Sequence, residues 1–261
     1  MRFCVAALIE DWRSKWAEGT DGATDRAFPF GWAQLNSVSN TDANCPGVAH
    51  DTETVTDYCN PKNVPSQDDP LSAWNSLTAG CEESGFCGIR WAQTSALTLP
   101  NTFQAVILDT PVASGSIHSP FKQPVGSRLA RGALSTYGRP YMSPVIAHAT
   151  KKGAKIVVSV GATPQALEIR KSLGFEVLSK GTGVWQSTPI TNSSGVSLTL
   201  DAANVTDGVA LRYLWYTTPC GTQPYQCPVY AQVPALKDRL SGELFLPLGP
   251  FILNLSSTKS G

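Results

Sequence analysis

His118 is the residue whose position in this chain most favours chemistry. It lies in the small-residue segment Gly115-Ser-Ile-His118-Ser-Pro120, between the apolar run Gln104-Ala-Val-Ile-Leu-Asp109 and a helix-like stretch that starts near Lys122. In an open α/β sheet, ligands bind beyond the carboxyl ends of the strands. A neutral imidazole placed there can take a proton from a nucleophile during attack and return it to the leaving group. The sequence therefore predicts a histidine-dependent site in this loop.

A serine that this base could activate is not evident in the sequence. Free serine is a poor nucleophile, so it needs a base within hydrogen-bonding reach. The chain has no Gly-x-Ser-x-Gly elbow, and neither Gly-Asp-Ser nor Gly-Gln-Ser occurs. Ser114, Ser116 and Ser119 share the loop of His118, but close neighbours along a chain seldom meet as nucleophile and base. Asp109 closes the preceding strand, where it could orient the imidazole or simply cap the next turn.

The remaining histidines and the cysteines do not suggest a metal site. His50 lies in a long polar segment, and His148 lies in an expected strand, where a surface or packing role is the simpler interpretation. No Cys-x-x-Cys is present, and no cluster of Cys and His has the spacing of zinc ligands. We therefore expect no metal in the candidate site.

Charge and composition limit the partners of the protein. Its 261 residues contain 20 Lys and Arg and 20 Asp and Glu, so the formal net charge is zero. This balance argues against nucleic acid or an anionic membrane surface as the main partner. No apolar stretch approaches the roughly 18 residues that a membrane-spanning helix needs.

Residues 1–138 show the pattern of an α/β domain, in which helices separate strands of a parallel sheet. The sequence predicts an amino-terminal helix with Leu8, Ile9, Trp12 and Trp16 on one apolar face. Further expected elements are a strand in 28–35, a helix that begins at Asp69-Pro70, a helix over 88–97, the strand 104–109 and the helix after Lys122. The last helix is expected to carry Arg128 and Arg131 on its exposed face.

Residues 139–261 show the pattern of a β-rich domain of antiparallel strands, as in a sandwich or jelly roll. The runs 144–149 and 155–160 flank Lys152-Gly153, which predicts a hairpin. Residues 196–200 and 209–215 alternate between apolar and other side chains, with Arg212 on the face opposite Leu211 and Tyr213. Residues 165–173 fit either a short helix or a strand.

The seven cysteines favour an oxidising compartment. Cys81/Cys87 and Cys220/Cys227 would close short loops, and a Cys45/Cys59 bond would staple the polar segment. Cys4 would then remain, either as a buried thiol or bonded to a partner elsewhere. Three N-glycosylation triplets add mildly to a secreted or lysosomal localisation: Asn192-Ser-Ser194, Asn204-Val-Thr206 and Asn254-Leu-Ser256.

Several short pieces of the chain form a recognisable series: Ala7-Leu-Ile-Glu-Asp-Trp-Arg13, Phe28-Pro-Phe-Gly31 with Gln34-Leu35, Ile89-Arg-Trp-Ala-Gln93, Leu99-Pro-Asn-Thr102, Gly115-Ser-Ile-His118 with Lys122-Gln123, Ala210-Leu-Arg-Tyr-Leu-Trp215, Pro219-Cys220 and Gln226-Cys-Pro228. In this order they resemble the sialate O-acetylesterases, which are serine hydrolases of the SGNH type. The resemblance implies a partial flavodoxin-like parallel sheet followed by a β domain, with His118 as the catalytic base. It implies hydrolysis of O-acetyl esters of sialic acid through an acyl-enzyme, without a metal or organic cofactor.

The chain also departs from this family in two ways. The family's early Gly-Gln-Ser-Asn block, which holds the nucleophile, is absent, so the chain resembles a carboxyl-terminal portion and is expected to be inactive alone. Ser116 stands where related bacterial sequences carry an Asp, and loss of an orienting acid can cost about 10⁴ in rate. Asp109, Ser116 or a backbone carbonyl could orient His118 instead. Arg90 could pair with a sialate carboxylate, or it could be a structural ion-pair partner.

The rival interpretation is a non-catalytic module that binds carbohydrate or another partner through its β domain and exposed aromatic residues. A chain that lacks the leading strands of its sheet would also expose an unpaired strand edge, which favours aggregation.

Overall fold

The computed structural model of the protein describes eight stretches of the chain. They are 4–37, 86–111, 117–138, 143–161, 166–215, 219–221, 223–233 and 245–257. The expected helix at Asp69-Pro70, the Cys45/Cys59 pair and His50 lie outside these residues.

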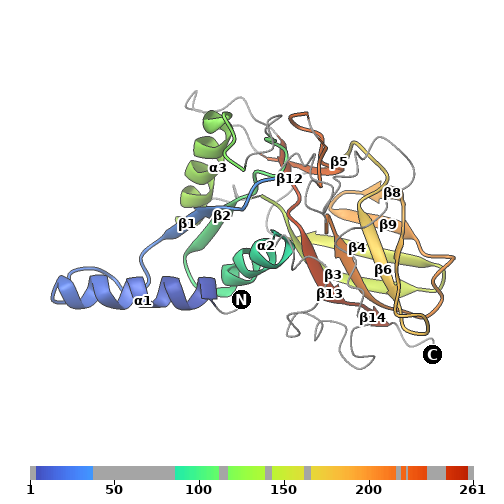
Figure 1. Ribbon diagram of the computed structural model, residues 1–261, viewed down its shortest axis with the longest axis horizontal. Coiled ribbons are helices and arrows are strands. Elements are labelled where there is room, and N and C mark those ends of the chain that lie inside the picture. Colours follow the sequence, from blue (N-terminus) through green and yellow to red (C-terminus); the bar gives the residue numbers. More distant parts are fainter. Residues whose placement is uncertain are drawn as a thin grey trace.

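In the described residues up to 138, three α-helices and a pair of parallel strands form the first part of the molecule (Figure 1). The helices are α1 (Cys4–Gly19), α2 (Phe86–Ser95) and α3 (Lys122–Ser135), and a 3-10 turn, Ala96–Thr98, follows α2. β1 (Phe30–Ala33) and β2 (Thr102–Ala105) pair in parallel. α3 packs on both strands, and a Cβ atom at Gly132 would lie only 2.5 Å from the Phe103 ring, so this close approach requires glycine.

These elements confirm the expected helices over 88–97 and after Lys122 and the strand within 28–35. The second strand is shorter than expected, because pairing with β1 stops at Ala105 and residues 106–109 continue as irregular buried chain. The α/β character of the first part is therefore confirmed as a parallel pair with packed helices. The wider flavodoxin-like sheet stays a prediction.

The buried face of α1 differs from the predicted one. Ile9, Arg13 and Ala17 are buried, whereas Trp12 and Trp16 are 49% and 57% exposed. The predicted face was wrong because Arg13 occupies the interior: its guanidinium donates to Phe28 O at 2.7 Å and to Pro100 O at 2.9 Å. Arg13 thus ties the segments that lead into β1 and β2, and Trp12 packs edge-on against Phe30.

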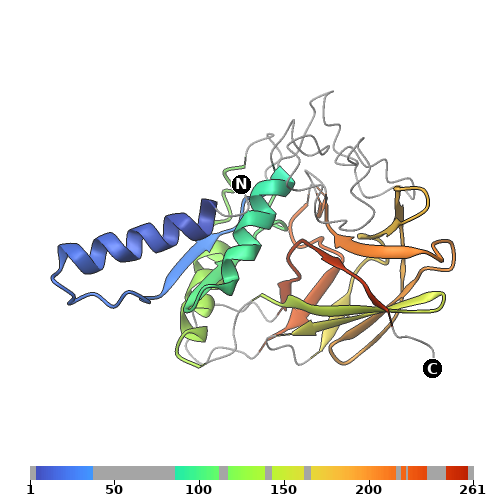
Figure 2. The ribbon, with the colours of Figure 1, turned by 90° about the horizontal axis from the view of Figure 1, so that it is seen from below.

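Antiparallel strands form the second part of the molecule, and they gather on the side away from α1 in both views (Figures 1 and 2). The five-stranded sheet has the order β14-β3-β4-β9-β8, the four-stranded sheet β13-β10-β6-β7 and the three-stranded sheet β12-β11-β5. The bounds are β3 Val145–Lys152, β4 Lys155–Gly161, β5 Leu167–Ile169, β6 Phe175–Ser179, β7 Trp185–Ser187, β8 Ile190–Ser194, β9 Ser197–Asp201, β10 Gly208–Tyr213, β11 Val229–Gln232, β12 Phe245–Pro247, β13 Phe251–Asn254 and β14 Ser256–Ser257.

The predicted hairpin at Lys152-Gly153 joins β3 and β4, and Gly153 has the positive φ that such a turn needs. The segment 165–173, which fitted either a helix or a strand, contains the strand β5. The β-rich character of the second part is confirmed, with β14 as a parallel edge strand beside β3.

Both faces of β10 are buried, which the alternation did not predict. Leu211 and Tyr213 pack in the main core, and Arg212 lies on the opposite face, as expected. That face is also covered: Arg212 Nε donates to Glu176 Oε2 at 2.7 Å, and its guanidinium lies 4.4 Å from the centre of the Trp185 ring. A central strand between two layers therefore holds a buried ion pair.

The main hydrophobic core crosses the expected domain boundary at residue 138. Val106 and Leu108, which follow β2, pack in the same cluster as Phe175, Tyr213 and Phe251 of the β part. The division into two domains stays a prediction, and in the described residues the two parts share one core. None of the described helices is long and apolar enough to cross a membrane.

Candidate active site

His118 is exposed in the connection between β2 and α3. The residue after it, Ser119, is buried, and its Oγ accepts a hydrogen bond from Phe121 N at 3.1 Å. This local turn leads directly into α3 at Lys122. The position of His118 between a strand and the following helix agrees with the sequence, and its exposure leaves the imidazole accessible from solvent. The role of His118 as a base stays a prediction.

Asp109 lies at the start of the same connection and is fully buried. Arg128 of α3 donates to both carboxylate oxygens of Asp109, from Nη1 to Oδ1 at 2.5 Å and from Nη2 to Oδ2 at 3.0 Å. Arg128 Nη1 also donates to Val106 O at 2.6 Å. The two ends of the His118 connection are therefore joined by one buried, two-pronged ion pair.

This geometry corrects the expected face of α3. Arg128 and Arg131 are buried, at 1% and 0% exposure, rather than exposed. The prediction was wrong because it took charged residues on a helix as solvated, whereas Arg128 meets a carboxylate and a carbonyl from the segment after β2. A buried charge is tolerated when it is paired and hydrogen-bonded.

Ser37 and Asn36, which follow β1, form hydrogen bonds to the backbone of the segment that follows β2. Ser37 Oγ donates to Leu108 O at 2.7 Å, and Asn36 Nδ2 donates to Thr110 O at 2.8 Å. Both parallel strands thus end at one place, and the backbone on either side of Asp109 is anchored by buried polar side chains. Such anchoring fixes the position from which the His118 connection departs.

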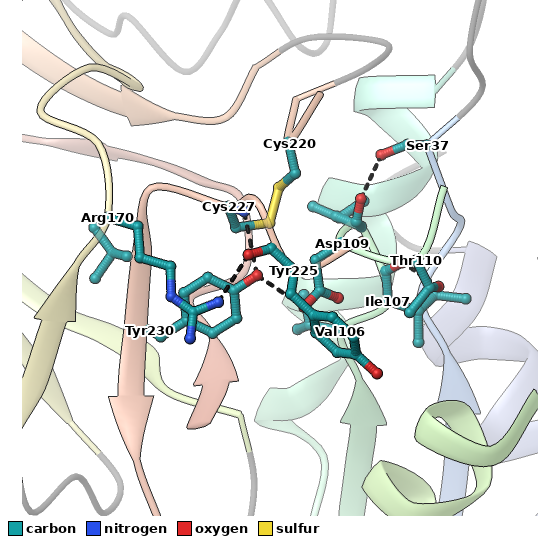
Figure 3. The surroundings of a disulfide bond; sticks show 12 residues. Ser37, Val106, Ile107, Asp109, Thr110, Arg170, Cys220, Tyr225, Cys227 and Tyr230 are labelled. Carbon is teal, nitrogen blue, oxygen red and sulfur yellow. Dashed lines mark hydrogen bonds between the residues drawn. A yellow bond between two sulfur atoms is a disulfide. The ribbon is translucent and has the colours of Figure 1, made fainter. Parts of the chain in front are cut away.

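A third set of contacts reaches Asp109 from the β part (Figure 3). Tyr230 of β11 donates its hydroxyl to Asp109 Oδ2 at 2.9 Å, and Tyr225 N donates to Asp109 O at 2.8 Å. The loop that carries Tyr225 is closed by the Cys220–Cys227 disulfide, which confirms the predicted pair. Asp109 is therefore bound by α3 and by the β part, while Ser37 and Asn36 hold the residues on either side of it.

The carboxylate of Asp109 is thus engaged by Arg128 and Tyr230 among the described residues. A carboxylate that orients a catalytic imidazole accepts a hydrogen bond from the ring nitrogen. The orienting role of Asp109 toward His118 stays a prediction, and the described contacts support an anchoring role instead. Ser116, the other candidate, lies outside the described residues.

The described hydrogen bonds of Arg90 go to the protein backbone, and its pairing with a sialate carboxylate stays a prediction. Arg90 is fully buried in α2, where it donates from Nε to Leu35 O at 2.9 Å and from Nη2 to Asn36 O at 2.6 Å. Burial lowers the pKa of its guanidinium to about 9. Its function is to hold the chain that leaves β1, next to the segment that carries Asp109.

Gln34 is also buried, and it joins the same region. Its amide nitrogen donates to Thr94 Oγ1 at 3.0 Å and to Arg90 O at 3.3 Å. Leu35 N donates to Gln93 Oε1 at 2.8 Å. The described hydrogen bonds of the Gln34 side chain thus go to α2, whereas its backbone N donates to Ala105 O of β2 at 2.9 Å.

The other predicted residues with chemical potential lie apart from this site. His148 is exposed on β3. Cys87 is disulfide-bonded, and its expected partner Cys81 lies outside the described residues. Among the described residues, no group of three or more His, Cys, Asp and Glu side chains could hold a metal ion.

Sequence reasoning missed Tyr230 and the burial of Arg128. The Asp109–Arg128 pair could have been suggested by two signals: an acid at the end of a strand, and an arginine on the helix that follows it. No sequence signal pointed to Tyr230, because it is 121 residues from Asp109.

The parallel strand pair, its packed helices and the antiparallel sheets together form a fold that is seen in a solved protein. The structure is similar to a crystal structure of a carbohydrate acetylesterase from Xanthomonas citri, with a TM-score of 0.64 and 23% sequence identity, over 97% of this chain and 45% of that one. At this identity the similarity shows the fold alone.

Sequence comparison identifies the particular relatives. Residues 146–254 match the family described as the sialate O-acetylesterase C-terminal domain. The sialate O-acetylesterases of Homo sapiens and Mus musculus are each 29% identical to the chain, over 98% and 95% of its length. The motif resemblance is confirmed: the chain is similar to a carboxyl-terminal portion of sialate O-acetylesterase, and it spans only 42% and 40% of these two relatives.

Proposed function

We propose that this chain forms the histidine-bearing and accessory part of a serine esterase that removes O-acetyl groups from sialic acids. His118 is the general base and acid in this proposal, and the attacking serine belongs to polypeptide outside this sequence. The observation that carries it is the exposed His118 in a connection whose two ends are joined by the buried Asp109–Arg128 pair. The names of the relatives supply the substrate class, an acetylated carbohydrate.

The proposed reaction is an acyl transfer. The serine hydroxyl would attack the acetyl carbonyl while the His118 imidazole takes its proton, and His118 would return that proton to the sugar oxygen that leaves. Water would then attack the acyl-enzyme with the same base, releasing acetate. Precise placement of the imidazole matters in each step, since small displacements of a catalytic group cost large factors in rate. The rigid anchoring around Asp109 fits this requirement.

The sequence supports the proposal that the nucleophilic serine lies outside these 261 residues. No Gly-x-Ser-x-Gly, Gly-Asp-Ser or Gly-Gln-Ser occurs in the 261 residues. We therefore expect the chain alone to leave 4-nitrophenyl acetate and O-acetylated sialic acid uncleaved above the buffer rate. A fusion that places the amino-terminal part of the mouse sialate O-acetylesterase ahead of this chain is expected to hydrolyse both. The intact mouse enzyme is the positive control.

Two results would contradict this assignment. Turnover by the chain alone that disappears in His118→Ala would show that the nucleophile lies within these 261 residues. A soluble, folded fusion that cleaves neither ester would remove the support for an esterase function.

We also propose that the protein passes through the secretory pathway and carries N-linked glycans. Asn192 on β8, Asn204 and Asn254 on β13 are all exposed, and their amides make no hydrogen bond to the described side chains or backbone. The Cys220–Cys227 disulfide supports an oxidising compartment. β8 is an edge strand on the side of the β part away from β1 and β2 (Figure 1), so a glycan there leaves the candidate site accessible.

The glycan proposal predicts a mass shift in a eukaryotic secretory host. The protein, expressed behind a signal peptide, is expected to lose mass on treatment with an N-glycosidase. Substituting glutamine at Asn192, Asn204 and Asn254 together should abolish that loss. An untreated protein with the bare polypeptide mass would refute the proposal.

A further inference from the structure

We propose that Tyr230 is a positioning residue for His118: from the β part, its hydroxyl fixes the end of the segment after β2 from which the His118 connection departs. The catalytic meaning of this role rests on the proposed esterase function, whereas the positioning itself does not. Tyr230 lies on β11, in a part of the chain that carries none of the expected catalytic residues.

The hydrogen bond from Tyr230 to Asp109 has a defined direction. The buried hydroxyl accepts from Cys227 N at 3.2 Å and donates to Asp109 Oδ2 at 2.9 Å. Burial raises the pKa of Tyr230 well above its ordinary value, and the negative charge of Asp109 raises it further. The hydroxyl therefore keeps its proton throughout the physiological range and serves as a permanent donor to the carboxylate.

The ring of Tyr230 is itself held in place, as Figure 3 shows. The guanidinium of Arg170 lies 3.7 Å from the ring centre, and Arg170 Nη1 donates to Tyr225 O at 2.7 Å. Tyr225 N in turn donates to Asp109 O at 2.8 Å. The Cys220–Cys227 disulfide closes the loop that presents Tyr225. The β part thus binds Asp109 at two places: Tyr230 binds the Asp109 carboxylate, and Tyr225 N binds the Asp109 backbone carbonyl.

The position of Asp109 is transmitted to both ends of the His118 connection. Asp109 lies at its amino-terminal end, and Arg128 of α3 binds both of its carboxylate oxygens at the other. Without the tyrosine hydroxyl, Oδ2 keeps only the longer, 3.0 Å contact with Arg128. The carboxylate can then turn toward Arg128, which shifts the ends of the connection and the imidazole between them.

The test observes the histidine ring signals by NMR in the chain as it is. The protein has three histidines, so His118→Gln assigns the His118 signals and His148→Gln those of His148. In Tyr230→Phe we expect the His118 ring signals to move by more than their line width while those of His148 stay in place. The matched control is Tyr213→Phe, which removes another buried hydroxyl that accepts from Val229 N at 3.2 Å and should leave both histidines unchanged.

A second variant, Arg170→Gln, tests the proposal in case Tyr230→Phe disturbs the fold as a whole. The Arg170 side chain is 28% exposed, so Arg170→Gln should fold, release the Tyr230 ring and move the His118 signals in the same direction by a smaller amount. Unchanged His118 signals in both variants would overturn the proposal. So would an equal response to Tyr213→Phe.

An activity measurement separates this inference from the proposed function. In the fusion with a supplied serine, Tyr230→Phe is expected to lower kcat by about 10- to 100-fold with KM nearly unchanged, because it displaces the base and leaves substrate contacts intact. If the fusion with unsubstituted Tyr230 is inactive, the esterase proposal is contradicted. The NMR signals of the His118 ring would still test whether Tyr230 positions His118. An active fusion with the same kcat in Tyr230→Phe would overturn the positioning role alone.

Discussion

Replacing His118 with alanine in the serine-supplied fusion is expected to lower acetyl-ester hydrolysis by about 10⁴- to 10⁶-fold. A serine hydroxyl is nearly inert without a base, and removal of the histidine from a serine–histidine pair costs about as much as removal of the whole catalytic set. The measurement is kcat/KM for 4-nitrophenyl acetate and for an O-acetylated sialic acid. A loss confined to kcat would place the role of His118 in the transition state.

His148→Ala is the matched control for this experiment. His148 is also exposed, but it lies on β3 in the five-stranded sheet, away from the segment after β2. Its removal should leave kcat/KM within a factor of two, a change typical of a surface substitution. A fusion in which His118→Ala retains more than about a tenth of the activity would exclude His118 as the base.

Substituting methionine for Arg128 is expected to destabilise the chain by about 3–5 kcal/mol, since it leaves the Asp109 carboxylate buried with only Tyr230 as a side-chain partner. Methionine approximates the length of the aliphatic part of the arginine, so the loss reflects charge and hydrogen bonding more than volume. The measurement is the free energy of unfolding from urea titration, with equal slopes in both proteins as the condition for comparison.

Two further variants define what this loss means. Arg26→Met removes an exposed arginine whose nearest carboxylate oxygen, of Glu18, is 4.0 Å away, and it should cost at most about 1 kcal/mol. Pairing Arg128→Met with Asp109→Leu should recover part of the stability, because a buried ion pair replaced as a whole costs less than one broken in half. A loss below about 1 kcal/mol for Arg128→Met alone would show that the pair does not hold the connection together.

These two predictions concern different properties of one connection. His118 is exposed, and its removal should abolish chemistry while leaving the fold intact. Arg128 is buried, and its removal should weaken the fold. A stable His118→Ala variant and an unstable Arg128→Met variant would together separate the reacting group from the side chains that place it.

Much of the local structure follows from sequence alone. The hairpin at Lys152-Gly153, the helix after Lys122 and the Cys220–Cys227 disulfide depend on turn preferences, helical periodicity and short loop length. The same holds for the position of His118 after a buried strand. These signals act within a few residues, so a single sequence contains the information needed to predict them.

The predictions failed where polar side chains are buried. Arg128 was assigned to the exposed face of its helix and the burial of Arg13 was not predicted, yet both are buried and bind carbonyl oxygens of other segments. Helical periodicity identifies a face by hydrophobicity, so a face that contains an arginine is scored as exposed. For this reason Trp12 and Trp16 were predicted to lie on the buried face of α1, whereas both are exposed.

Local patterns in the sequence were enough to predict most of the described helices and strands, the candidate base and the resemblance to sialate O-acetylesterases. The pairing of buried polar groups depends on the folded chain: Asp109 meets Arg128, and Tyr230 reaches Asp109 from 121 residues away. Burying a charge is unfavourable unless a partner is present, and that partner comes from whichever distant segment the fold brings alongside. Only the packed arrangement of helices and sheets makes that choice.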